Sequence, residues 1–228
     1  MRALIIEHDR LSTPERIGDH LESRGFTLEP FVVVEDIDDP EVTVVFPDQD
    51  GYDLIVLMGA PWSTYDPGLQ GWVRPEVGFV RHHLDQGTPI LGICFGAQIM
   101  STSLGGTVSP SVLPEYGWGT ITSAEPAIAS GPWFQYHGDE FTLPEGATPL
   151  AHNESGLQAF SFGRSLAVQF HPEVTASLLE SWCAVGGDRK LIEFGFDPES
   201  LIEETSRLAP DSQPALEQLI DWWLDDIH

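Results

Sequence analysis

The sequence is poor in positive charge. Lysine occurs once, at Lys190, and lysine and arginine together number 10 against 36 aspartates and glutamates, so the formal net charge is −26. Binding to nucleic acid or to anionic lipid needs clustered cations. The shortage of cations therefore argues against both as partners.

Long hydrophobic runs are also missing. No stretch approaches the ~20 consecutive apolar residues that a membrane helix requires, and the apolar run after Met1 is broken at Glu7, too early for the core of a signal peptide. We therefore expect a cytoplasmic protein. The 228 residues suffice for one domain with a sizeable core.

Cysteine is scarce as well. The two cysteines, Cys94 and Cys183, cannot form a disulfide framework, and neither has the spacing of a metal site. The histidines give no ligand spacing either, so no metal and no cofactor are expected. Cys183 lies in a predicted helix, where a packing role is expected, which leaves Cys94 as the thiol available for chemistry.

Short apolar runs alternate with segments of helical period, which favours an α/β fold: a three-layer sandwich with a mainly parallel central sheet. Strands are predicted at residues 3–6, 31–34, 53–58 and 89–93. Crossover helices are predicted at residues 14–24 and 72–86, each ending before a glycine. The last three strands are almost continuously apolar, as expected where helices cover both faces of a sheet.

The pattern changes between residues 106 and 170, where short alternating runs are punctuated by glycine and proline. It predicts a small antiparallel β region without helices, with strands at 118–122, 157–162 and 166–170. Helical patterns return over about 174–228. Asp197 is a predicted N-cap and Pro210 a predicted helix end.

The last predicted helix carries an apolar stripe from Leu216 to Ile227, and we expect it to pack back on the domain. No repeat or long linker divides the chain. A single domain over residues 1–228, with its C-terminal helices packed on it, is therefore predicted.

The strongest local signal is the segment GICFGAQ at residues 92–98, where a buried strand ends and a helix begins. Small residues two before and two after a nucleophile allow the tight strand-to-helix turn that exposes its side chain. There the helix N-terminus stabilises a thiolate at Cys94, and the amide of Phe95 points toward an oxyanion position. Taken alone, the pattern fits a small buried cysteine equally well.

The tripeptide His171-Pro172-Glu173 follows a predicted strand, at the edge where open α/β sheets bind ligands. Proline favours extended backbone, in which residues two apart share a side, so Glu173 can reach one ring nitrogen of His171. The other nitrogen then faces Cys94 and can protonate a departing amine. Taken alone, the tripeptide is more typical of a surface turn with an incidental ion pair.

Two weaker signals lie on the same edge of the predicted sheet. The turn at Gly59 and Ala60, directly after a buried strand, can present a backbone N–H as a second oxyanion donor, although glycine and proline after a strand usually mark only a loop. His8 and Asp9 follow the first strand, where a structural or rim role is expected.

Together these segments resemble the class I glutamine amidotransferases, the Cys-His-Glu triad type. Residues 92–98 are similar to the family's G-x-C-x-G-x-Q turn, and residues 169–173 contain its F-H-P-E signature. The segments EYGW at 115–118 and YHGDEFTLP at 136–144 resemble stand-alone members related to the glutaminase domain of GMP synthetase. The likeness covers nearly the whole chain and implies the flavodoxin-like fold of that family.

By this resemblance Cys94 is the nucleophile, His171 the general acid and base, and Glu173 the group that orients His171. It places the oxyanion and substrate-binding groups at seven positions: Gly59, Ala60, Phe95, Gln98, Tyr136, His137 and Gly138. Gln98 helps to hold the substrate, and the loop at 136–138 flanks its α-amino and α-carboxylate groups through the backbone, so His137 is not a catalyst. Many relatives have glycine where this chain has Ala60, a residue that resists positive φ.

The implied reaction is hydrolysis of the glutamine γ-amide through a γ-glutamyl thioester on Cys94, which releases glutamate and ammonia. The length leaves no room for an ATP-dependent synthetase domain, so a synthetase or acceptor protein in trans is the implied partner. One alternative is a γ-glutamyl hydrolase or peptidase with the same triad. Another, of a different class, is a non-catalytic module that senses or binds glutamine.

Overall fold

A computed structural model of the protein describes residues 1–47 and 51–226; Ile227, at the end of the predicted stripe, lies outside this range. The main element is an eight-stranded sheet with the order β2-β1-β3-β4-β10-β9-β8-β6. Its strands are β1 (Arg2–Glu7), β2 (Thr27–Val32), β3 (Leu54–Leu57), β4 (Ile90–Ile93), β6 (Thr122–Ser123), β8 (Thr148–Asn153), β9 (Gly156–Phe162) and β10 (Ser165–Val168).

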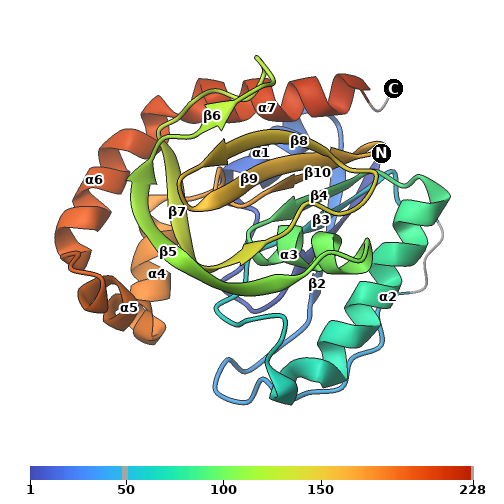
Figure 1. The fold of residues 1–228 in the computed structure, drawn as a ribbon, viewed down its shortest axis with the longest axis horizontal. Helices are drawn as coiled ribbons and strands as arrows, with labels where there is room; N and C mark the ends of the chain where they lie inside the picture. The colour runs from blue at the N-terminus through green and yellow to red at the C-terminus, as the bar shows by residue number, and fades with distance from the viewer. Residues whose placement is uncertain (48–50, 227–228) are drawn as a thin grey trace.

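The first five strands of this order pair in parallel, and β10, β9, β8 and β6 continue the sheet in antiparallel fashion. A separate antiparallel pair, β5 (Val108–Gly119) and β7 (Trp133–Phe141), curves away from the central sheet (Figure 1). The predicted α/β fold with a mainly parallel sheet and a small antiparallel region is therefore confirmed. One detail differs, because β6, β8 and β9 extend the central sheet instead of standing apart from it.

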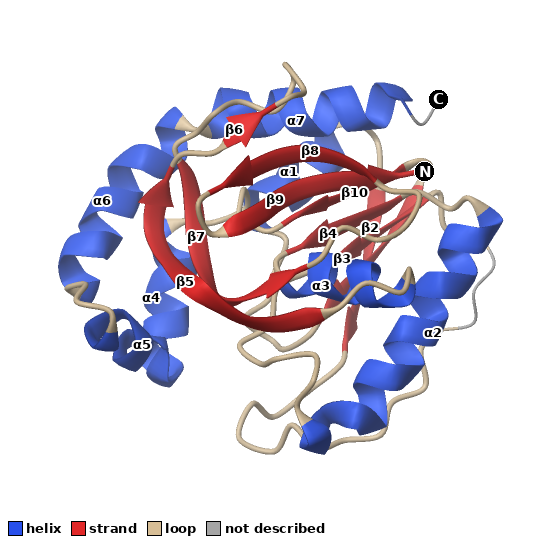
Figure 2. Cartoon of the chain, viewed as in Figure 1, coloured by secondary structure: helices blue, strands red, loops and turns tan. Residues whose placement is uncertain are grey.

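Seven α-helices surround the sheets in the part of the chain that the structure describes (Figure 2). They are α1 (Glu15–Ser23), α2 (Gln70–Gln86), α3 (Phe95–Ser103), α4 (Ala176–Trp182), α5 (Asp188–Glu193), α6 (Pro198–Asp211) and α7 (Gln213–Asp226). As predicted, Asp197 caps α6, because its carboxylate accepts a hydrogen bond from the backbone N–H of Ser200. Pro210 stands in the last turn of α6, one residue before the helix ends.

Successive side chains of the parallel strands point to opposite faces of the sheet and so divide the core into two layers. In β3, Leu54 and Val56 face a cluster that includes side chains of α1 and α7. Ile55 and Leu57 face the opposite cluster, which includes side chains of α2 and α3. Both faces of the inner parallel strands such as β3 are therefore covered by helices, which explains their almost unbroken hydrophobicity.

A third cluster joins β5 and β7 to the C-terminal helices. Phe134 on β7 packs with Leu179 of α4, Leu191 of α5 and Leu201 of α6. Cys183 lies directly after α4 and is half-buried against this cluster. The helices α4 to α6 thus flank the β5–β7 pair, on the left of Figure 1.

The prediction was wrong at two local points. The strand predicted at 31–34 begins earlier, as β2, and lies at the edge of the sheet, where its side chains are only partly buried. The loop predicted at 136–138 is part of β7, because Tyr136 and His137 pair with β5, while Gly138 lies at the irregularity between the two paired stretches. Among the described residues, no helix has both the length and the apolar character needed to cross a membrane.

The contact between α3 and β3 yields a prediction about Gly96, with Gly78 of α2 as the control. A Cβ on Gly96 would lie 2.2 Å from the carbonyl oxygen of Leu57, so Gly96→Ala should lower the free energy of unfolding by about 3 kcal/mol. The control is Gly78→Ala on the exposed side of α2, where a Cβ meets nothing within 4 Å. That change should raise the free energy of unfolding by about 0.5–1 kcal/mol. Urea unfolding measures both, and equal effects would contradict the close approach.

Candidate active site

A cavity of about 500 Å³ opens at the carboxyl edge of the parallel strands. Four consecutive strands of the sheet each supply a residue that lines it: Asp9 follows β1, Gly59 follows β3, Cys94 follows β4, and His171 follows β10. This is the edge at which open α/β sheets bind ligands. The candidate residues predicted from separate motifs therefore meet in one place.

Cys94 stands on a strained turn between β4 and α3. Its backbone has φ +50° and ψ −104°, a conformation that residues other than glycine rarely adopt. The flanking glycines make the turn possible, because a Cβ on Gly92 would lie 2.6 Å from the sulfur of Met100 and one on Gly96 would strike β3. The Cys94 N–H donates to the carbonyl oxygen of Val168 on β10, 2.8 Å away. These constraints hold the side chain above the sheet edge.

His171 and Glu173 form a buried pair opposite Cys94. The His171 Nδ1 lies 2.7 Å from Glu173 Oε1, as the shared side of an extended His-Pro-Glu backbone predicts. The backbone N–H of His171 donates to the carbonyl oxygen of Phe134 on β7, 2.8 Å away. The ring also packs edge-on against Trp182, with ring centroids 5.2 Å apart. The imidazole is thus fixed from two sides.

The ionisation of His171 depends on its two neighbours. Burial lowers the pKa of His171, but the negative charges of Glu173 and Cys94 outweigh burial and raise that pKa from 6.5 to about 10. His171 Nε2 is buried without a nitrogen or oxygen partner among the described residues, and the Cys94 sulfur interacts with it and contributes to the raised pKa. The histidine therefore holds a proton at neutral pH, and both it and Cys94 line the cavity.

Two further groups touch the sulfur or lie beside it. The side-chain amide of Gln169 donates toward Cys94 Sγ over 3.5 Å. Phe95 is the first residue of α3, so its backbone N–H has no acceptor within the helix. Positive partial charge from these groups favours a negative charge at this point of the cavity.

The turn after β3 lies against the histidine. A Cβ on Gly59 would lie 2.9 Å from His171 Cε1 and 3.8 Å from Cys94 Cβ, so only glycine lets the turn approach this closely. Ala60 follows it on the cavity wall. Among the described residues other than glycine, only Glu15 and Cys94 have positive φ, so the turn places no left-handed demand on Ala60.

The remaining predicted binding residues also line the cavity. Gln98 is buried on α3, and its Oε1 has no hydrogen-bond partner among the described residues. Tyr136 donates its hydroxyl to the carbonyl oxygen of Gly187, 2.6 Å away. His137 is turned into the protein, with Nδ1 3.1 Å from the Asp139 carbonyl oxygen and Nε2 3.3 Å from a Glu115 carboxylate oxygen. Its imidazole nitrogens are therefore occupied away from Cys94.

A comparison with protein families bears on this arrangement. A family model described as glutamine amidotransferase class-I matches residues 12–181, well over half of the chain. The chain belongs to the class I glutamine amidotransferases. It is therefore an enzyme of this type, as the two sequence signatures predicted.

Curated relatives of this amidotransferase include GMP synthases. The protein from Thermomicrobium roseum is 34% identical over 139 residues, which cover 56% of this chain and 24% of the relative. One from Thermus thermophilus is 29% identical over 167 residues, covering 67% of this chain and 31% of the relative. The chain thus spans about a quarter to a third of the length of these relatives.

Solved structures of other proteins have a similar fold over nearly the full length of this amidotransferase. A glutamine amidotransferase from Thermotoga maritima is 25% identical, with a TM-score of 0.84, covering 99% of this chain and 98% of that one. A glutamine amido transferase from Methylobacillus flagellatus is 20% identical with a TM-score of 0.82, covering 100% of this chain and 95% of that one, and supports the fold alone.

Three residues that line the cavity of this amidotransferase were not predicted as site residues. The Asp139 carboxylate accepts hydrogen bonds from the hydroxyls of Ser63, at 2.6 Å, and Tyr65, at 2.8 Å. These bonds tie the segment after β3 to β7 across the cavity. Only the coordinates reveal them, because hydroxyl and carboxylate groups 74 and 76 residues apart give no periodic signal.

Arg16 is the other residue that sequence reasoning missed. Its guanidinium, on α1, donates to the carbonyl oxygen of Pro172 over 2.6 Å and to Ser212 Oγ over 3.1 Å. Burial lowers the pKa of Arg16, while the charge of Glu173 opposes that change. A half-buried cation thus supports the turn that carries the histidine.

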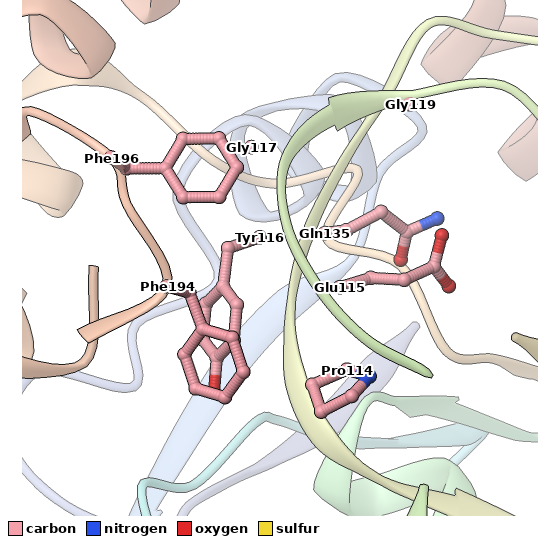
Figure 3. Close-up of a pocket in the computed structure, with 8 residues that line it drawn as sticks. All are labelled: Pro114, Glu115, Tyr116, Gly117, Gly119, Gln135, Phe194 and Phe196. Carbon is pink, nitrogen blue, oxygen red and sulfur yellow. The ribbon is translucent and has the colours of Figure 1, made fainter. Parts of the chain in front are cut away.

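A smaller cavity of about 270 Å³ adjoins the first through Tyr116. Figure 3 shows Phe194 and Phe196 on the same side of β5 as Tyr116, with Glu115 and Gln135 pointing to the other side. The rings of Tyr116 and Phe194 stack with centroids 4.6 Å apart.

Across the described residues, no cluster of three or more histidine, cysteine, aspartate or glutamate side chains is arranged to hold a metal.

The raised pKa of His171 gives a prediction about stability and pH. A pKa raised by folding adds stability that is complete below about pH 6.5 and is lost as the pH rises through about 10. From pH 7 to pH 10 the wild type should therefore lose about 1–3 kcal/mol more of its free energy of unfolding than His171→Gln. Urea unfolding at both values measures this. His152→Gln, at an exposed position on β8, is the control and should follow the wild type; an equal loss in His171→Gln would contradict the assignment.

Proposed function

We propose that this amidotransferase hydrolyses the γ-amide of glutamine through a thioester on Cys94. One observation carries the proposal: a cysteine on a strained strand-to-helix turn and a buried His171–Glu173 pair line the same cavity, and His171 Nε2 is buried there without a nitrogen or oxygen partner among the described residues. Nucleophile, proton carrier and orienting carboxylate are the parts that amide cleavage by a thiol requires.

In the first step the Cys94 thiolate attacks the γ-carbonyl carbon of glutamine. The carbonyl π electrons move to oxygen, and the backbone N–H groups of Phe95 and Ala60 stabilise the oxyanion. His171, protonated at Nε2 and held by Glu173, donates its proton to the nitrogen as the C–N bond breaks, so that ammonia leaves. A γ-glutamyl thioester remains on Cys94.

In the second step water replaces ammonia. His171, now neutral, removes a proton from water, whose oxygen attacks the thioester carbon at the same oxyanion site. The C–S bond breaks, glutamate leaves, and Cys94 returns as a thiolate beside a protonated His171. The pKa of His171, raised by Glu173 and Cys94, favours the return of the proton to this histidine.

Recognition of the substrate's α-amino and α-carboxylate groups is assigned to Gln98 and to the backbone of β7. The Oε1 of Gln98 is buried without a partner among the described residues and can accept a hydrogen bond from an α-ammonium group. Tyr136 and Gly138 also line the cavity, and their backbone groups are the ones assigned to the substrate's α-groups. His137 keeps its ring bonded to neighbouring protein atoms and serves as support.

The proposal includes a single amidotransferase domain over the whole chain. Leu219 and Ile220 of α7 belong to the same core cluster as Ile17 of α1, which supports this reading. By analogy with the GMP synthases that contain a similar region, the ammonia is passed to a synthetase or other acceptor protein in trans.

The size of the cavity favours a second candidate function. About 500 Å³ lies well within the range of sites for small organic ligands, so a γ-glutamyl amide with a larger leaving amine is an alternative substrate for the same triad. Side-by-side turnover of glutamine and of γ-glutamyl peptides separates a glutaminase from a γ-glutamyl hydrolase.

The identity of the nucleophile is tested by covalent trapping. A glutamine analogue with an electrophilic carbon in place of the amide should form one adduct, on Cys94, because only this thiol lies in the cavity beside His171. Intact-mass and peptide mass spectrometry locate the adduct. Cys94→Ser should remove the adduct. An adduct on Cys183 would contradict the proposal, and so would binding of the analogue without any covalent adduct.

The two other triad members should differ in their effect on turnover. His171→Ala removes the proton carrier, so kcat should fall by at least about 1,000-fold. Glu173→Ala leaves the imidazole in place without its orienting carboxylate and should retain part of that activity. Ammonia release measures both, and Arg81→Ala, at an exposed position on α2 outside the cavity lining, is a control for surface charge. A Glu173→Ala enzyme as inactive as His171→Ala would argue against the assigned division of roles.

A further inference from the structure

A second buried histidine–carboxylate pair lies behind the turn that follows β3. His8, at the end of β1, has no solvent exposure, and its Nε2 lies 2.8 Å from Oε1 of Glu76, a fully buried residue of α2. His8 Nδ1 lies 3.1 Å from the carbonyl oxygen of Gly59. Neither His8 nor Glu76 lines the cavity. The mechanism proposed above uses neither residue.

The bond to Gly59 determines which way one peptide group points. The Gly59–Ala60 peptide is trans, and the carbonyl and the N–H of a trans peptide point in opposite directions. The Gly59 carbonyl oxygen is directed at His8, which is behind the turn and outside the cavity lining. The N–H of Ala60 is therefore directed to the cavity side, where Cys94 and His171 lie next to Gly59.

We propose that His8 and Glu76 position the oxyanion hole of this amidotransferase: His8 Nδ1–H donates to the Gly59 carbonyl oxygen, and this hydrogen bond aims the Ala60 N–H at the substrate oxygen. The inference rests on the proposed function, because it assigns the Ala60 N–H to the tetrahedral intermediate. His8 and Glu76 touch neither substrate nor the reacting atoms, so they are positioning residues.

Glu76 fixes the protonation of the ring. A carbonyl oxygen and a carboxylate can both only accept hydrogen bonds, so Nδ1 carries a proton toward Gly59 and Nε2 carries one toward Glu76. Burial lowers the pKa of His8, but the charge and hydrogen bond of Glu76 outweigh it and raise that pKa overall. The doubly protonated ring, with its donor toward Gly59, is thus favoured over the neutral one.

The ring also contacts the residue that supplies the other proposed oxyanion donor. Its edge packs against the Phe95 ring with centroids 4.7 Å apart, and against Trp72 with centroids 5.9 Å apart. These aromatic contacts leave His8 little freedom to rotate away from Gly59. One buried side chain thus adjoins both backbone segments that form the oxyanion hole.

Two amide substitutions of His8 separate its hydrogen bonds. In His8→Asn the side-chain nitrogen can occupy the place of Nδ1, which keeps the bond to Gly59 and loses the one to Glu76. In His8→Gln it can occupy the place of Nε2, which keeps the bond to Glu76 and loses the one to Gly59. We expect kcat for glutamine hydrolysis within about 3-fold of wild type in H8N and lowered by about 10- to 100-fold in H8Q. KM should stay within about 3-fold in both, because an oxyanion donor acts mainly on the transition state.

Two controls distinguish positioning from damage to the fold. Iodoacetamide alkylates a thiolate without forming an oxyanion, so its rate of reaction with Cys94 should be the same in H8N, H8Q and wild type. His20→Gln alters another histidine–carboxylate pair, His20 with Asp221 between α1 and α7, and should leave kcat unchanged. Slower alkylation in H8Q alone would indicate a disturbed site and overturn the inference.

The outcomes also separate this inference from the proposed function. A wild-type enzyme that hydrolyses neither glutamine nor γ-glutamyl amides overturns the proposed function and this inference with it. An active wild type in which H8Q retains as much kcat as H8N overturns only the role of His8. A larger loss in H8N than in H8Q would assign the effect to Glu76 and not to the Gly59 carbonyl.

Discussion

The close approach of α3 to β3 is the constraint on which the site depends. With no side chain at Gly96, the first turn of the helix rests on the Leu57 carbonyl, and the Gly96 N–H donates to the carbonyl oxygen of Met58 over 3.1 Å. Cys94, the residue between β4 and α3, has a φ of +50° in this turn. Its Cβ lies beside the turn at Gly59, where an added Cβ would be 3.8 Å away.

The same site also depends on contacts between segments far apart in the chain. The backbone of His171 is bonded to Phe134, in the separate β5–β7 pair, and that of Cys94 to Val168. Arg16, near the N-terminus, supports the Pro172 carbonyl across 156 residues. The parallel sheet alone would thus hold the sulfur, whereas the imidazole needs the second sheet and α1 as well.

This division explains how much could be predicted from the sequence. The turn at Cys94 and the His171–Glu173 pair have local signals, a glycine spacing and an extended tripeptide, but each signal alone also fits a buried cysteine or a surface turn, so they could be predicted only in combination and with the family resemblance. The pairing of β9 with β10, which extends the central sheet, and the bonds of Asp139 to two hydroxyls are set by tertiary packing. His8 illustrates the boundary: its place at the end of β1 was predicted, but its bond to Gly59 depends on the register between β1 and β3.

The acidic excess bears on the proposed reaction in a way that individual contacts do not. Glutamine carries no net charge, so a field from a protein of net charge −26 neither attracts nor repels it to first order. Glutamate, the product, carries one negative charge and is repelled. Inside the protein the signs are balanced locally, because His171 faces Glu173 and His8 faces Glu76. The surface field thus favours departure of the product, while each buried histidine of the site faces a carboxylate of opposite charge.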